Sequence, residues 1–463
     1  MNKMSAGKIF GRAFVFISTF AIFAFALALV APVLASAPAQ ASAPASVDAP
    51  AQVAAPAPDS RVRSDIAFLE DAARKLLDGC VMRAADGTLL YTPDGKANYA
   101  ALWTRDFAYM VESAGDLMPP ANIERCIEYL IKGARESDGA IPDHVQVDGL
   151  PLYAAGGPDN QLGQPGLDNA PFLVFAASAY LDMIPADRRS VLYAKWAPRL
   201  IKGMNYIPRD AASGLVWNET AKPHSPYGFT DTVGKTGELF MESLLYWRAA
   251  RMLARLEGLY GFGADARDFA ARAAAIEKSA GALWDEKTGM FFAATRDCRQ
   301  TDVWASAYAV AVDFPPVAGE KERRILDWLV ANYYQCVWHG QVRHLPLGEY
   351  WDRLLMPVEK DRYQNGAFWA TPSGWVMEAL NRRDPGLARR MFGDLIDDFR
   401  IGGICECVNV GYRKLESYVD SATNPLGAAR RLWNLGVVEP WGRTKITYII
   451  SIRYDVKTTL FPP

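Results

Sequence analysis

Polar side chains stand at the start of an apolar segment near residue 103, and their types are suited to a polyhydroxylated ligand. Trp103 opens this segment, and Arg105 and Asp106 follow it within three residues. A guanidinium offers a rigid fork of hydrogen-bond donors and a carboxylate offers only acceptors, so the two together suit a vicinal diol. An arginine in a first helical turn opposes the helix dipole, which predicts a carboxylate or ligand partner for Arg105.

The same arrangement recurs further along the chain. Other apolar segments carry carboxylates or amides near their beginning, namely Asp168 and Asn169, Asp231, Asp302, Gln364 and Asn365, and Asp420. The segments that precede them add Asp143, His144, Trp217, Glu406 and Asn409. Aromatic rings that could form the wall of a sugar site are those of Trp103, Trp217, Trp304, Trp351, Tyr363 and Trp369, although such rings also fill large cores.

A repeated pair of helices is predicted to position these residues. Amphipathic helices are expected over 62–78, 122–136, 187–206, 265–283, 320–334 and 385–400. Segments that are apolar nearly all round, and therefore buried, begin near residues 103, 167, 230, 301, 363 and 418. Their regular spacing indicates six stacked copies of one supersecondary unit. We therefore expect an all-α fold, an (α/α)6 toroid of six outer–inner helix pairs, with a short C-terminal β hairpin at 444–455.

In such a toroid all inner helices run the same way, so their N-termini open at one end. The polar residues would then converge on a shared pocket. The alternative is that each Asp, Asn or Thr is an ordinary N-cap, worth about 1 kcal/mol. Capping is the simpler explanation for any one of these residues, whereas six that converge on one aromatic-rimmed opening favour a binding site.

Composition excludes several classes of protein. Half of the 463 residues are hydrophobic, which excludes a disordered chain, and the net charge is −2. No Lys/Arg-rich run of the kind that binds nucleic acid is present, so we expect no nucleic-acid partner. Cys405 and Cys407 lack the spacing of a zinc site, and neither metal nor cofactor is predicted. In an oxidising compartment the six cysteines could pair, and the sequence does not choose among the pairings.

The N-terminal segment predicts export. Residues 1–36 read as a signal peptide or membrane anchor, with an uncharged run at 13–35 that is long enough to stay in a membrane. Residues 37–60 form an Ala/Pro-rich linker, and 61–463 are expected to form a single catalytic domain. The expected location is the periplasm or the medium, with membrane anchoring through 13–35 as the alternative.

The stretch Trp103-Thr104-Arg105-Asp106 is similar to the Trp-x-Arg-Asp signature of the six-hairpin glycoside hydrolases. This superfamily includes glucoamylase-like, trehalase-like and glucosidase-like families, and the resemblance extends over most of residues 62–435. It implies an exo-acting glycoside hydrolase whose Arg105 and Asp106 bind hydroxyls of the terminal sugar of an oligosaccharide or glycan.

The resemblance also implies which residues are catalytic. The stretch 227–240 is similar to the region that carries the general acid, and Asp231 falls at the place of the acid. Glucoamylases have Glu there, so Asp231 favours the trehalase- and glucosidase-like relatives. Glu406, in Cys-Glu-Cys-Val-Asn, falls on the loop expected for the general base, with Glu349 as its rival. Buried, paired structural roles are expected for Glu238 and Glu242.

These assignments predict an inverting mechanism on an α-linked, gluco-configured sugar, with two carboxylates roughly 6.5–9.5 Å apart. The residues expected to bind substrate are Trp103, Arg105, Asp106, Asp143, His144, Asp168, Trp217, Asp302, Trp304, Tyr363, Gln364, Asn365 and Asn409. The alternatives are a polysaccharide lyase or unsaturated-uronide hydrolase on the same toroid, or a carbohydrate-binding protein without catalysis. A lyase would require a Tyr or His base and a cationic neutraliser, whereas the polar residues here are mostly acidic.

Overall fold

The computed structural model describes residues 58–261 and 263–433. The predicted export segment, nearly all of the Ala/Pro-rich linker and the predicted hairpin at 444–455 lie outside these residues.

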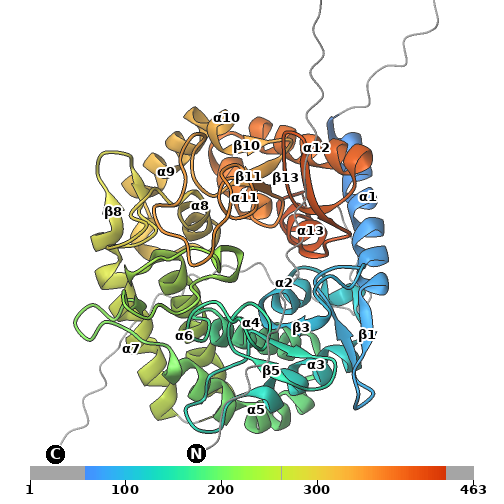
Figure 1. Cartoon of the computed structure of the whole chain (residues 1–463), viewed down its shortest axis with the longest axis vertical. Coiled ribbons are helices and arrows are strands. Elements are labelled where there is room, and N and C mark those ends of the chain that lie inside the picture. Colours follow the sequence, from blue (N-terminus) through green and yellow to red (C-terminus); the bar gives the residue numbers. More distant parts are fainter. Residues whose placement is uncertain (1–57, 262, 434–463) are drawn as a thin grey trace, which may run out of the picture. The chain divides into compact units, whose positions relative to one another are not determined.

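Within the described residues, twelve helices of nine residues or more form two concentric layers (Figure 1). The outer helices are α1 (Pro58–Gly79), α3 (Pro120–Gly133), α5 (Ala186–Tyr206), α7 (Gly263–Ser279), α9 (Glu320–Ala331) and α12 (Pro385–Gly402). The inner helices are α2 (Thr104–Ala114), α4 (Asn169–Met183), α6 (Phe240–Tyr260), α8 (Val303–Ala311), α11 (Ser373–Arg383) and α13 (Asp420–Trp433). This is the predicted (α/α)6 toroid.

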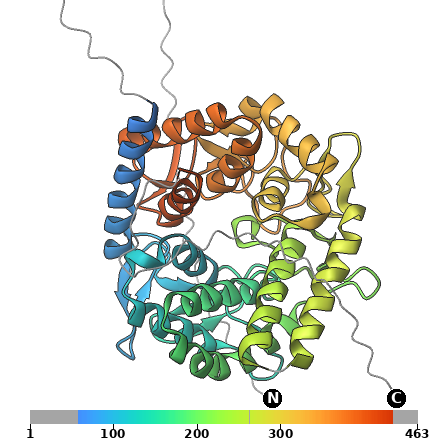
Figure 2. The same ribbon diagram turned by 180° about the vertical axis from the view of Figure 1, so that it is seen from behind.

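The ring of inner helices is closed. Each inner helix packs on the next in chain order, and α13 packs on α2, so the last repeat meets the first. The outer helix α1 also contacts α13, and Figure 2 shows it lying along the junction between the first and the last repeat. Among the described residues, no helix combines the length and apolar character that a membrane span requires.

Short strands connect the helices at the end of the toroid where the inner helices begin. The strands in the smaller sheets are β1 (Val81–Arg83), β2 (Leu89–Tyr91), β3 (Ala101–Trp103), β4 (His144–Gln146), β5 (Pro151–Leu152), β6 (Trp217–Asn218), β7 (Gly237–Glu238), β8 (Trp284–Asp285) and β9 (Met290–Phe291). A five-stranded antiparallel sheet contains β10 (Val337–Trp338), β11 (Gln341–Arg343), β12 (Phe368–Trp369), β13 (Cys405–Asn409) and β14 (Tyr412–Glu416) in that order. The short helices are α10 (Tyr333–Cys336), η1 (Gly115–Leu117), η2 (Gly228–Thr230), η3 (Ala280–Leu283) and η4 (Pro315–Val317).

Two inner helices begin ten residues later than the sequence predicts, at Phe240 and Ser373 instead of 230 and 363. Asp231 follows the turn η2, and Gln364 lies in the loop before β12, so neither is at a helix N-terminus. Neither helix extends back to the predicted start. Gly237, with a φ of +84°, lies outside helical backbone, and Pro372 directly precedes α11, where a proline cannot donate a helical hydrogen bond. Glu242 consequently lies in the first turn of α6, where it pairs with the fully buried Lys235 at 2.7 Å.

Aromatic side chains fill the axis of the toroid. Tyr109 packs edge-on against Phe172 at 4.8 Å, and its hydroxyl lies 2.9 Å from that of Tyr227. Phe229 lies above this layer, 6.2 Å from the ring of Tyr109 and 5.5 Å from that of Trp369. The centre of the ring is therefore a packed core with a floor of aromatic rings.

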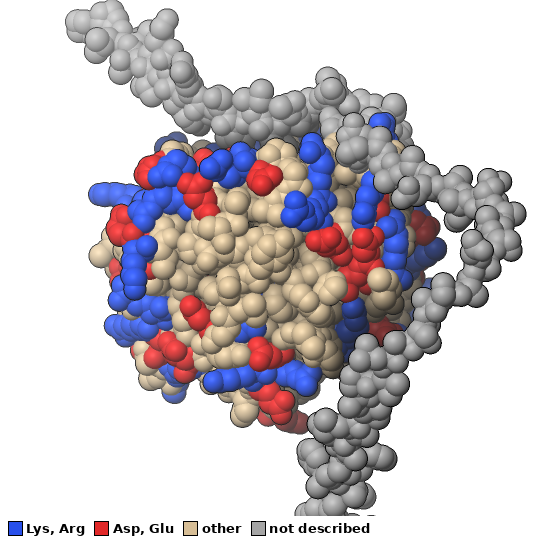
Figure 3. All heavy atoms as spheres, turned by 90° about the horizontal axis from the view of Figure 1, so that it is seen from above, with Lys and Arg blue, Asp and Glu red and all other residues tan. Residues whose placement is uncertain are grey.

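The surface carries charges of both signs. On the side of the described part shown in Figure 3, Lys and Arg lie beside Asp and Glu around an uncharged area. All six cysteines fall within the described residues; each is buried and forms no disulfide.

Candidate active site

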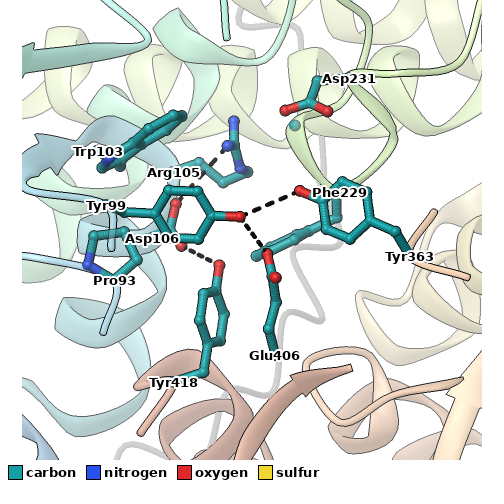
Figure 4. A pocket seen from close by; sticks show the side chains of 11 residues that line it. Pro93, Tyr99, Trp103, Arg105, Asp106, Phe229, Asp231, Tyr363, Glu406 and Tyr418 are labelled. Atoms are coloured by element: carbon teal, nitrogen blue, oxygen red, sulfur yellow. Dashed lines mark hydrogen bonds and ion pairs between the residues drawn. The ribbon is translucent and has the colours of Figure 1, made fainter. Parts of the chain in front are cut away.

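A small pocket lies above the aromatic floor, and the empty space of about 270 Å³ between its walls is partly open solvent. Its lining comes from four parts of the chain, and the residues are Pro93, Tyr99, Trp103, Arg105, Asp106, Gly228, Phe229, Asp231, Tyr363, Glu406 and Tyr418 (Figure 4). The same wall therefore combines carboxylates, a guanidinium and aromatic rings around one small space.

Arg105 is buried in the wall among carboxylates. Its Nη1 lies 3.3 Å from Asp143 and 3.4 Å from Asp168, and its Nη2 lies 3.8 Å from Asp106. The guanidinium also stacks over the Phe229 ring at 5.3 Å. A Cβ atom at position 228 would lie 1.6 Å from the guanidinium, so Gly228 is required for this approach. The partner predicted for Arg105 is therefore a set of three aspartates.

Asp231 faces the cavity from the turn that follows η2. Burial raises its pKa to about 7, and the neighbouring Asp143 and Glu406 charges act in the same direction. The charge of Arg105 and a hydrogen bond from Gln364 Nε2 to Oδ1, 2.8 Å long, oppose this rise. A carboxyl group with this pKa is protonated in a substantial fraction of molecules at neutral pH.

Glu406 faces Asp231 from the opposite side of the cavity (Figure 4). The Tyr99 hydroxyl donates to Glu406 Oε1 at 3.0 Å, and the Lys414 ammonium forms an ion pair with Oε2. Burial raises the pKa of Glu406, whereas the Lys414 charge and both hydrogen bonds favour the ionised form. The two carboxyl groups thus have different partners, a neutral amide for one and an ammonium for the other.

A rigid loop presents Tyr99 to Glu406. The fully buried Asp94 accepts hydrogen bonds from the backbone N–H groups of Lys96, Asn98 and Tyr99, at 2.9–3.1 Å. The backbone of Asp94 pairs with that of Tyr418, which lies just before α13. Tyr418 in turn donates to Asp106 Oδ1 at 2.6 Å.

The structure brings six of the predicted site residues to the cavity and places three others directly behind it. Those in the lining are Trp103, Arg105, Asp106, Asp231, Tyr363 and Glu406. Behind them, Asp143 and Asp168 bind Arg105, and His144 stacks on Trp103 at 4.1 Å while it bonds to Asp143 at 2.9 Å. Burial raises the pKa of Asp168 to about 6.

The remaining predicted residues do not line the cavity. Asp302 is an N-cap, which accepts from Ala305 N at 2.8 Å, and Trp304 stacks on His344. Gln364, Asn365 and Asn409 use their side-chain amides on protein partners.

Trp217 lies in β6 with Arg296 over its ring, and the rival base Glu349 is exposed and outside the lining. The capping alternative therefore holds for Asp302, whereas the carboxylates of Asp106 and Asp231 face the cavity.

Sequence reasoning missed Tyr99, Phe229, Tyr418 and Lys414. The stretch 405–409 is a strand, β13, and not the expected loop, and Lys414 comes from the adjacent strand β14. The register pairs Lys414 with Cys407, so a regular hairpin would not place this cation beside Glu406, and no local signal in the sequence predicts the contact. Among the described residues, no group of three or more His, Cys, Asp and Glu side chains is arranged to hold a metal ion.

No protein-family model matches the sequence, and no curated protein matches it. Solved structures share its fold. A GH63 mannosylglycerate hydrolase from Thermus thermophilus matches with a TM-score of 0.57 and 16% identity, over 78% of this chain and 99% of that one.

A rhamnosidase from Klebsiella oxytoca matches with a TM-score of 0.54 and 16% identity, over 80% of this chain and 63% of that one. A glucoamylase from Saccharomycopsis fibuligera matches with a TM-score of 0.52 and 13% identity, over 81% of this chain and 96% of that one. The chain therefore has the (α/α)6 fold of these glycoside hydrolases, as the Trp-x-Arg-Asp resemblance implied.

The raised pKa of Asp231 predicts that Asp231→Asn stabilises the protein at alkaline pH. The folded state holds the Asp231 proton to about pH 7, whereas the unfolded chain releases it near pH 4, so wild type loses stability as pH rises between these values. The substitution removes this loss, and we expect unfolding free energy to rise by up to ~4 kcal/mol at pH 8 and little at pH 4.

Denaturant unfolding of both proteins across pH 4–8 measures this difference. Asp352→Asn, at an exposed carboxylate outside the cavity lining, is the matched control and should change stability little at any pH. If the difference in unfolding free energy between Asp231→Asn and wild type is the same at pH 4 and at pH 8, Asp231 is not held protonated in the folded state.

Proposed function

We propose that the protein is an exo-acting, inverting glycoside hydrolase with Asp231 as general acid and Glu406 as general base. The observation that carries the proposal is the pair of carboxyl groups that face each other across one small cavity, one with a pKa of about 7 and the other ion-paired with lysine. Hydrolysis of an acetal requires such a pair: one group protonates the leaving oxygen while the other activates water.

The general acid must carry a proton at working pH. Asp231 is suited to this role because burial and two carboxylate neighbours favour its protonated form. In the reaction the proton passes from Asp231 to the glycosidic oxygen as the bond from that oxygen to the anomeric carbon breaks.

The general base must be ionised and must reach water on the other face of the sugar. The ammonium of Lys414 and the hydroxyl of Tyr99 favour the ionised form of Glu406. Glu406 then takes a proton from the water molecule whose oxygen attacks the anomeric carbon, and the configuration inverts.

The wall around Arg105 supports binding of a terminal sugar. Arg105 Nε and Trp103 Nε1 have no hydrogen-bond partner within the described residues, and both side chains line the cavity. These donors, the Asp106 carboxylate and the Phe229 ring together fit a ring with vicinal hydroxyls. Because the aromatic layer closes the cavity below, we propose cleavage at a chain end, from an α-linked gluco-configured sugar.

The tyrosines in the lining argue against a lyase. A lyase would use Tyr as a base, but burial raises the pKa values of Tyr99, Tyr363 and Tyr418 well above the ordinary value. Each therefore stays protonated and serves as a hydrogen-bond donor. A carbohydrate-binding protein without catalysis would have no use for a neutral and an ionised carboxyl group facing each other.

Hydrolysis with inversion is the first expected outcome. Oligosaccharides with different terminal sugars are incubated with the protein, and NMR identifies the first anomer released. We expect the β anomer from an α-linked substrate, and loss of activity by 100-fold or more, roughly, in Asp231→Asn and in Glu406→Gln. The control Glu349→Gln, an exposed glutamate outside the cavity lining, should retain activity; a released α anomer would refute inversion.

The pH profile is expected to report both carboxyl groups. Activity should fall above about pH 7, when Asp231 loses its proton, and on the acid side, when Glu406 gains one. Lys414→Met removes the charge that favours ionised Glu406, so the acid limb of kcat/KM should move to higher pH by roughly one unit. The control is Lys360→Met at an exposed lysine outside the lining. Superimposable acid limbs for Lys414→Met and wild type would contradict this assignment.

We also propose that the chain is exported through residues 1–36, because of the uncharged run at 13–35. The full chain should be recovered from the periplasm, medium or membrane fraction of a bacterial host, and a variant that lacks 1–36 from the cytoplasm. Immunoblots of fractionated cells measure this, and a full chain that stays in the cytoplasm would count against export.

A further inference from the structure

Gln364 makes four hydrogen bonds to the turn that carries Asp231. Its Oε1 accepts from the backbone N–H and the hydroxyl of Thr232, at 2.8 and 2.7 Å. Its Nε2 donates to the Gly228 carbonyl at 3.2 Å and to Asp231 Oδ1 at 2.8 Å. Because the Thr232 N–H is a donor only, the amide orientation is fixed, and the group that contacts Asp231 is N–H.

These bonds leave Gln364 no capacity for a substrate. Both amide hydrogens and the amide oxygen have protein partners, and the side chain is buried, with 3% of its surface exposed. The backbone is held as well, since Trp351 Nε1 donates to the Gln364 carbonyl at 2.9 Å and the neighbouring Asn365 accepts from Trp351 N. The substrate contact predicted for Gln364 is thus replaced by contacts to the turn.

We propose that Gln364 is a positioning residue for the general acid, which directs the acidic proton of Asp231 to Oδ2. This inference rests on the proposed function. An oxygen that accepts an amide N–H is the carbonyl oxygen of a protonated carboxyl group, so the proton resides on the other oxygen. Asp231 Oδ2 makes no hydrogen bond to the described residues and belongs to a side chain that lines the cavity.

The same bond assists the transfer step. When the Oδ2–H bond breaks, the proton goes to the glycosidic oxygen and the electron pair stays on Asp231. The N–H of Gln364 then donates to a carboxylate, and hydrogen bonds to charged groups are stronger than those to neutral ones. Gln364 therefore stabilises the ionised acid that the reaction produces.

The chain position of Gln364 connects the acid to the opposite wall. Its neighbour Tyr363 has a φ of +40° and lies in the lining, where the Lys414 ammonium lies 3.8 Å from the centre of its ring. The Tyr363 hydroxyl lies 3.5 Å from that of Tyr99, which binds Glu406. One dipeptide thus contacts the acid through one side chain and the partners of the base through the other.

The experiment removes the N–H group at constant size. In Gln364→Met, Asp231 loses a hydrogen bond that favours its ionised form, so its pKa should rise by roughly one unit or more. The pKa is measured without any substrate, from the pH dependence of the stability change that Asp231→Asn causes. This change is measured twice, once in the wild-type chain and once in the chain that carries Gln364→Met. Gln364→Glu serves if Gln364→Met does not fold, because a second carboxyl group beside Asp231 raises its pKa in the same direction.

The kinetic arm uses an oligosaccharide cleaved by wild type. In Gln364→Met, kcat should fall roughly 10- to 100-fold with little change in KM, and the alkaline limb should move to higher pH. Gln335→Met, at an exposed glutamine, is the matched control. An Asp231 titration that is the same with and without Gln364→Met overturns the proposal, and so does a shifted titration with unchanged kcat. The stability arm gives its answer even if no glycoside is cleaved, so failure of the proposed function is seen separately.

Discussion

The candidate site depends on the ion pairs between the buried guanidinium of Arg105 and the aspartates around it. Three aspartates lie within 4 Å of it, and all four side chains are buried. Carboxylates without this cation would repel one another at a high cost in free energy. The acidic groups can lie close together because the Arg105 guanidinium neutralises part of their charge. Arg105 is held in the first turn of α2, and the absence of a side chain at Gly228 leaves room for it.

The two carboxyl groups that face each other differ through their immediate partners and not through their depth. Both Asp231 and Glu406 are buried, and burial raises both pKa values. Asp231 accepts one hydrogen bond from an amide and feels the charge of Arg105 and of two acidic neighbours, whereas Glu406 directly contacts an ammonium and a phenol. The amide comes from Gln364 in the loop before β12, and the ammonium comes from Lys414 in β14. The proposed roles of acid and base rest on this difference in partners.

The sequence predicted the toroid well because the pattern that encodes it is local. Alternation of amphipathic and wholly apolar helices every 55–71 residues can be read without tertiary information, and the predicted outer helices match the observed ones. The polar groups at helix starts were harder to interpret, since capping and ligand binding use the same residues; Asp302 is a cap and Asp106 is not. Tyr99 was missed because its position depends on Asp94 and on a pairing with Tyr418, over 300 residues away. Such long-range contacts leave no periodic signal.

Closure of the ring between α13 and α2 has a consequence for the newly made chain. Synthesis proceeds from the N-terminus, so Arg105 and Asp231 are available well before the hairpin that carries Glu406. A nascent chain that lacks the last repeat has neither the second carboxylate nor the wall formed by Tyr418. The cavity wall of a nascent chain is therefore incomplete until α13 packs on α2.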